Sequence, residues 1–102
     1  MDAEFDFPEH MRPADVANTC TAYLIGTLAF ENPYEISVGL RRHGPFLNRD
    51  KWQLDQSNDY WLHIEGHHAR LTCRYPGQQA TIAAMRTLFM CRYQVPAVGN
   101  PA

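Results

Sequence analysis

The chain has 102 residues, which is enough for one domain with a substantial hydrophobic core and too few for two. Because 45% of the residues are hydrophobic and 20% are charged, the composition is globular and excludes a disordered chain. The formal net charge of −2 argues against a protein that holds nucleic acid by bulk electrostatic attraction.

The cysteines and the apolar segments indicate a cytoplasmic protein. The three cysteines are an odd number and are far apart, without a Cys-x-x-Cys pair, which favours free thiols in a reducing compartment. The acidic N-terminal segment has no basic region followed by an apolar run, so we expect no secretory signal peptide. No apolar stretch approaches the ~20 residues that cross a bilayer, and we expect no contact with a membrane.

Residues 1–12 carry acidic side chains around Phe5 and Phe7. Because chain termini are usually poorly ordered, we expect a flexible acidic arm here, ordered only if the two phenylalanines find a surface. A short acidic-aromatic binding segment is the alternative.

A first helix is predicted from Pro13 to about Phe30. Proline is favoured in the first turn of a helix, and Asp15 lies near the positive end of the helix dipole. No charged residue occurs between positions 16 and 30, whereas the surface helix of a monomer normally has a charged outer face. One apolar stripe holds Val16, Cys20, Tyr23, Leu24, Thr27 and Leu28, and the opposite side holds Ala22, Ile25, Gly26 and Ala29.

A first strand is predicted over Tyr34–Arg42, where apolar and polar residues alternate. Residues 46–58 are ambiguous. The alternation around Trp52 and Leu54 favours a short edge strand, although Asn48 could instead cap a single helical turn.

The segment Asp59–Tyr75 is the clearest structural signal, because polar and apolar residues alternate on both sides of Glu65-Gly66, as in a β-hairpin. With Glu65-Gly66 as a two-residue loop, His63 faces His68. Glutamate is a poor first residue for a type I′ turn, so a bulged loop remains an alternative. One face then carries Tyr60, Leu62, Ile64, Ala69, Leu71, Cys73 and Tyr75, and the other carries Trp61, His63, Glu65, His68, Arg70, Thr72 and Arg74.

A second helix is predicted over about Gln78–Tyr93, after the turn at Pro76-Gly77. It has two apolar stripes on nearly opposite sides, one with Ile82, Met85 and Phe89, the other with Ala80, Ala84, Leu88 and Cys91. We therefore expect an α+β fold with a three- or four-stranded antiparallel sheet and both helices on one face. Residues 13–93 form the single domain, between the arm at 1–12 and a flexible tail at 94–102.

The predicted order of helix, antiparallel strands and helix resembles double-stranded RNA-binding domains. The run Gln79–Ala84 lies where the alanine-rich last helix of that family begins. The resemblance implies a face that binds RNA. That family also places a lysine cluster at the start of this helix, where this chain has Gln78 and Gln79, so most of the charge that binds phosphate is absent.

His63, Glu65 and His68 share one predicted face, and opposed histidines suit a shared metal ion. A closed zinc site needs four ligands, and only His67 or His43 could add to this group. We therefore predict no metal and keep a histidine-based metal-binding protein as an alternative.

We predict a partner-binding surface on the polar face of the hairpin. Trp61 is expected opposite Arg70 as a cation–π pair, and tryptophan and arginine are frequent interface hot spots. The alternative is that the 46–54 loop or the arm covers Trp61. The predicted surface comprises Trp61, His63, His68, Arg70, Arg74, Arg41 and Trp52.

The surplus apolar surface of both helices favours a two-fold homodimer. The predicted dimer interface comprises Ala22, Ile25, Ala29, Ala84, Leu88 and Cys91.

The chain has no glycine-rich phosphate loop, no His-Glu-x-x-His and no Gly-x-Ser-x-Gly, so we expect neither an enzyme nor a cofactor. We expect a small protein that binds another protein, as an inhibitor or regulator of a larger macromolecular complex. Inhibitors carried by phages or plasmids, including anti-CRISPR-like proteins, are of this kind. A nucleic-acid-binding domain that uses Arg41, Arg42, Arg70 and Arg74 stays open as an alternative, disfavoured by the net charge.

Overall fold

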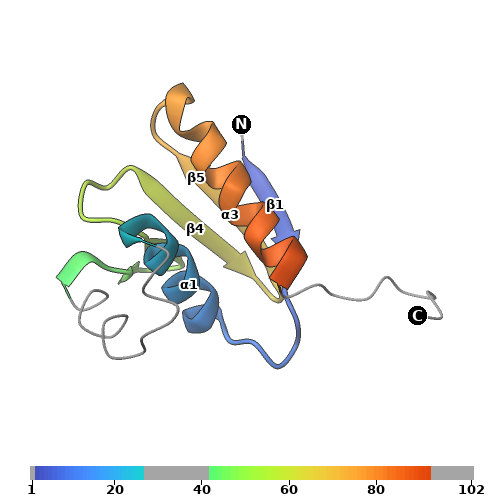
Figure 1. Ribbon diagram of the computed structural model, residues 1–102. Coiled ribbons are helices and arrows are strands. Elements are labelled where there is room, and N and C mark those ends of the chain that lie inside the picture. Colours follow the sequence, from blue (N-terminus) through green and yellow to red (C-terminus); the bar gives the residue numbers. More distant parts are fainter. Residues whose placement is uncertain (1, 27–41, 93–102) are drawn as a thin grey trace.

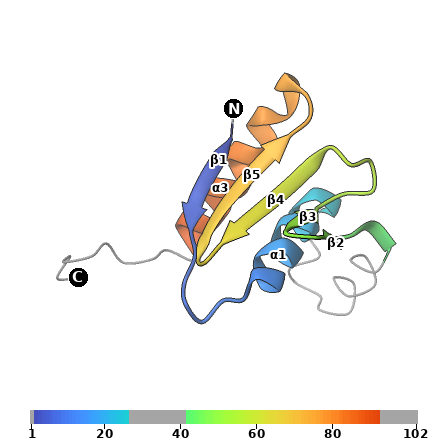
Figure 2. The ribbon, with the colours of Figure 1, turned by 180° about the vertical axis from the view of Figure 1, so that it is seen from behind.

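The computed structural model describes residues 2–26 and 42–92. In these ranges five strands form one antiparallel sheet in the order β1-β5-β4-β3-β2 (Figure 1). Helix α3 lies over β1 and β5, and helix α1 lies towards β3 and β4 on the same face (Figures 1 and 2). The α+β class is confirmed, but the sheet has more strands than the three or four expected. A strand also precedes the first helix, so the element order of double-stranded RNA-binding domains is not reproduced.

Strand β1 (Ala3–Asp6) corrects the expectation of a flexible arm. It pairs with β5, and the Phe7 N–H donates to the His67 carbonyl at 2.9 Å just beyond the strand. Phe5 and Phe7 are buried, and the Phe5 ring stacks on Phe89 with centroids 4.5 Å apart. Residues 3–7 alternate between apolar and acidic side chains, so pairing buries the apolar ones and leaves the carboxylates in water.

The outer edge of β1 is contacted by α3. The Arg86 Nε donates a hydrogen bond of 2.7 Å to the Glu4 carbonyl oxygen. Because β1 ends the strand order, no described strand pairs with this edge. Arg86 therefore satisfies a main-chain acceptor that would otherwise depend on water.

Helix α1 (Pro13–Ile25) begins where the sequence predicted. The Asp15 carboxylate accepts a hydrogen bond of 2.9 Å from the Arg12 backbone N–H. The helix ends earlier than the expected Phe30, because Gly26 adopts a φ of 133°, which residues with a side chain rarely take. Residues 27–30 lie outside the described ranges. The buried residues of α1 are Val16, Ala17, Cys20, Thr21 and Ala22.

The Thr21 hydroxyl ties α1 to the segment after β3. It donates to the Leu54 carbonyl at 2.8 Å, and Thr21 is 1% exposed. Thr21→Val should lower the free energy of unfolding by about 1–3 kcal/mol, because the buried acceptor loses its donor. Thr87→Val removes an exposed hydroxyl that bonds within α3, and should change it by less than about 0.5 kcal/mol. Urea unfolding of both variants would measure the difference, and equal losses would contradict this assignment.

The region 46–58 contains two short strands, β2 (Phe46–Asn48) and β3 (Lys51–Gln53). The short strand expected around Trp52 is therefore confirmed, although β2, and not β3, is the edge strand. The turn between them places Arg49 at a φ of 61°. The strand expected over Tyr34–Arg42 falls outside the described ranges except at its last residue.

The hairpin consists of β4 (Tyr60–Glu65) and β5 (His68–Cys73), and both predicted faces are correct within these strands, whereas Arg74 and Tyr75 lie beyond the end of β5. The pairing is shifted by two residues, so that Glu65 faces His68 and His63 faces Arg70. The loop is therefore Gly66-His67, with Gly66 at a φ of 64°. A glycine with positive φ at the first central position is typical of a type II′ turn, whereas the expected loop would have required Glu65 there.

Helix α3 (Gln79–Arg92) follows the short helix η2 (Pro76–Gln78), close to the predicted bounds. Its first predicted stripe, Ile82, Met85 and Phe89, is buried. The tail expected at 94–102 lies outside the described ranges. Among the helices of residues 2–26 and 42–92, none combines the length and apolarity needed to span a bilayer. The core of the described part contains Ala3, Phe5, Phe7, Met11, Val16, Ala17, Cys20, Leu54, Leu62, Ala69, Leu71, Ile82, Met85 and Phe89.

Candidate binding surface

Both described helices, α1 and α3, lie on one face of the sheet, and no helix or strand of residues 2–26 and 42–92 covers the other face (Figure 2). Strand pairing aligns one residue from each strand in a row across this open face. We call these residues the central row: Glu4, Arg70, His63, Lys51 and Asn48, from β1 to β2. Adjacent members of the row stand on neighbouring strands, close enough for their side chains to interact.

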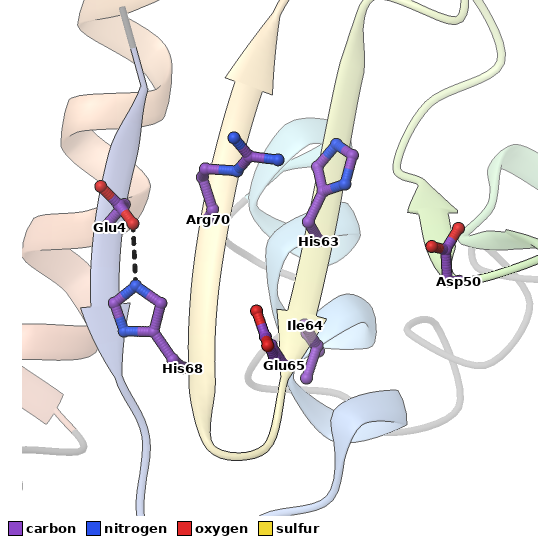
Figure 3. A pocket seen from close by; sticks show the side chains of 7 residues that line it. All are labelled: Glu4, Asp50, His63, Ile64, Glu65, His68 and Arg70. Atoms are coloured by element: carbon purple, nitrogen blue, oxygen red, sulfur yellow. Dashed lines mark hydrogen bonds and ion pairs between the residues drawn. The ribbon is translucent and has the colours of Figure 1, made fainter.

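A hollow of about 500 Å³ lies on this face (Figure 3). Arg70 on β5 and His63 on β4 stand side by side at one end, and Asp50 approaches from the turn between β2 and β3 (Figure 3). The lining of the hollow combines carboxylates with basic side chains. It consists of Glu4, Asp50, His63, Ile64, Glu65, His68 and Arg70.

His68 is bonded on both sides of its ring. Its Nδ1 lies 2.8 Å from an Asp6 carboxylate oxygen, and its Nε2 lies 2.8 Å from a Glu4 carboxylate oxygen. The hydrogen bond with Glu4, followed by that with Asp6, raises the pKa of His68 above its ordinary value. The predicted opposition of His68 and His63 is wrong, because the register places Glu65 opposite His68.

His63 has the opposite electrostatic setting. Partial burial lowers the pKa of His63, and the positive charges of Arg70 and then Lys51 lower it further, against smaller opposing effects of Asp50 and Asp2. His63 is therefore neutral at pH 7 and presents one donor and one acceptor to the hollow.

Trp61 pairs with a different cation from the one expected. The Lys51 Nζ lies 4.6 Å from the centroid of the Trp61 ring, and the residue opposite Trp61 on β5 is Thr72, not Arg70. Trp52 pairs with Leu62 and packs against the core, so it does not belong to the open face. The two-residue shift in pairing changes the residue opposite Trp61, and the alternation of side chains along β3 places Trp52 on the helix-facing side of the sheet.

The other predicted contact residues are dispersed. Arg74 is exposed and lies over the Tyr75 ring at 5.5 Å, and Arg41 is outside the described ranges.

Of the residues predicted to form the dimer interface, Ala22 was predicted wrongly, because the chain itself buries it to 1% exposure. Ile25 and Cys91 are exposed, Ala84 and Leu88 are half-buried, and Ala29 is not described.

Sequence reasoning placed Glu65 on this face but missed the other acidic side chains near the hollow, which are Glu4, Asp6 and Asp50. Glu4 and Asp6 could have been found from the alternation in residues 3–7, which is a strand pattern. Lys51 alternates with Trp52 and could have been placed on the open face in the same way. Asp50 had no such signal, because it lies in a turn.

The open face offers hydrogen-bonding and charged groups more readily than a nucleophile. The Cys20 thiol is buried, which raises its pKa and keeps it protonated, and it lies in the core away from this face. No group of three or more histidine, cysteine or carboxylate side chains in residues 2–26 and 42–92 has the geometry of a metal site.

Comparisons with protein-family models, curated proteins and solved structures found no significant match for this chain.

Proposed function

We propose that the chain is a small non-enzymatic module that binds another protein through the open face of its sheet, and so inhibits or regulates a larger complex. The observation that carries the proposal is the face without a described helix, where His63 and Arg70 line a hollow of about 500 Å³ and Trp61 stands on the same face of β4 as His63. Tryptophan and arginine dominate the energetics of many protein interfaces.

The central row indicates the chemistry of the partner. Arg70 and Lys51 flank His63 from the two neighbouring strands. A carboxylate of the partner placed in the hollow would accept hydrogen bonds from the Arg70 guanidinium and from a protonated His63. Because free His63 is neutral at pH 7, binding should take up a proton and should tighten as the pH falls.

Charge reversal on the central row tests the proposal. The tagged chain is used to capture its partner from the native host, and the purified partner is then titrated calorimetrically with wild-type and variant chains. Arg70→Glu should weaken binding by about tenfold or more, equivalent to about 1.4 kcal/mol. Arg12→Glu is the matched control, because Arg12 is 80% exposed at the start of α1, away from the sheet face.

The same titration in two buffers with different ionisation enthalpies measures proton uptake. His63→Gln should abolish that proton uptake. Arg70→Glu should still weaken binding when it is combined with His63→Gln. If Arg70→Glu and Arg12→Glu bind the partner as tightly as the wild type, the open face is not the contact surface.

We also propose a homodimer, supported by the exposed apolar residues near the ends of the two helices. Ile25 is 38% exposed and Met90 is 43% exposed. Light scattering should give twice the mass of the chain. A mass equal to one chain at concentrations up to about 1 mM would remove the dimer and leave the partner-binding proposal intact.

A further inference from the structure

The bridge from Glu4 through His68 to Asp6 joins two strands that are distant in the sequence. Glu4 and Asp6 are the two outward side chains of β1, and His68 begins β5. Both ring nitrogens of His68 lie 2.8 Å from carboxylate oxygens. An ionised carboxylate only accepts hydrogen bonds, so both nitrogens must donate, and only the protonated imidazolium can donate from both.

The groups around His68 are mainly acidic. Besides Glu4 and Asp6, the residue opposite it on β4 is Glu65, and His63 and Arg70 line the same hollow. Arg70 is engaged by Asp2, with Nη1 and Oδ2 3.5 Å apart. Loss of the His68 proton therefore leaves three carboxylates close together and turns one ring nitrogen into an acceptor that faces a carboxylate.

We propose that His68, held between Glu4 and Asp6, is a pH-sensitive clasp that fastens strand β1 to β5. Closed, the clasp holds in place the strand that brings Phe5 and Phe7 into the core. Open, it weakens the pairing of β1 with β5 and raises the fraction of molecules in which β1 detaches locally. The clasp is independent of any partner and is additional to the binding proposed for the open face.

The direction of the effect follows from the raised pKa of His68. The stabilisation of β1 is complete below the ordinary value of 6.5 and is lost as the pH rises through the raised pKa of the folded state. His63, with its lowered pKa, acts oppositely, since its contribution falls as the pH falls below 6.5. The pH dependence of the global free energy of unfolding therefore combines the contributions of both histidines. A measurement on β1 itself is needed to separate them.

Hydrogen exchange of the Phe7 amide provides that readout, because this N–H donates to the His67 carbonyl at the end of β1. The protection factor, corrected for intrinsic exchange, is measured by NMR between pH 5.5 and pH 8.5. In the wild type it should fall about two- to fivefold relative to the Leu54 amide, the range that exposed ion pairs produce. Leu54 donates to the Tyr60 carbonyl away from β1 and reports openings of the rest of the sheet.

Four variants separate the clasp from other histidines. His68→Gln and, independently, the Glu4→Gln/Asp6→Asn pair should flatten the pH dependence, whereas His10→Gln, at an exposed imidazole, should retain it. His67→Gln is needed as well, because the His67 ring contacts Phe7 edge-on with centroids 5.1 Å apart. A pH-independent ratio in the wild type, an unchanged dependence in either clasp variant, or its loss in His67→Gln alone would overturn the proposal.

Discussion

Replacing Phe5 with alanine should lower the free energy of unfolding by about 3–5 kcal/mol, although the residue lies near the start of the chain. Phe5 is 4% exposed and its ring stacks on Phe89 at an interplanar angle of 18°. Alanine removes that ring pair and leaves a cavity between β1 and α3 that the surrounding backbone can close only in part. Small domains are stable by about 5–15 kcal/mol in total, so the loss is a large share.

Urea unfolding followed by tryptophan fluorescence measures this loss, since Trp52 and Trp61 lie on adjacent strands of the sheet. Phe46→Ala is the control, because Phe46 is 40% exposed on the edge strand β2 and should cost less than about 1 kcal/mol. A Phe5→Ala midpoint equal to that of the wild type would mean that β1 is dispensable and that the N-terminal segment behaves as the arm first expected.

Leu62→Ala should cost about 2–5 kcal/mol, whereas Leu47→Ala should cost less than about 0.5 kcal/mol. The two leucines lie in one row on the helix-facing side of the sheet, joined through Trp52. Leu62 is fully buried at the centre of the core, but Leu47 is 63% exposed at the edge. The same change of side chain therefore reports where the core ends along the sheet.

The comparison uses the same urea titration, with the slope of free energy against urea checked for constancy between variants. Similar losses for both leucines would show that β2 is covered in solution.

The faces of the hairpin were predictable and its pairing was not. A shift of two residues leaves every side chain on the same face, so alternation alone places His63, His68 and Arg70 together whichever loop forms. Which residues face each other depends on the turn. Here the loop is Gly66-His67, because Gly66 can adopt the positive φ that the first central position of the turn requires. The predicted pairing of Trp61 with Arg70 failed for this reason.

The missing parts of the site come from pairings between distant segments. Glu4 meets His68 only because β1 joins β5, and Asp50 meets the hollow only because β3 joins β4. Local periodicity gives the type of an element and its faces, but it carries no information on which strand becomes a neighbour. The burial of Ala22 could not be predicted from the sequence for the same reason. An apolar side of a helix can be covered by its own chain as well as by a second copy.

The hydrogen bond from Arg86 to the Glu4 carbonyl has a consequence for solubility. An uncovered outermost strand is a template onto which further chains can add, the first step of fibrillar aggregation. A newcomer docking beside β1 would have to displace the guanidinium that occupies this acceptor, and would meet a charged side chain where it needs a main-chain donor. Sheet growth from this side is thereby discouraged, although the strand carries the aromatic side chain of Phe5.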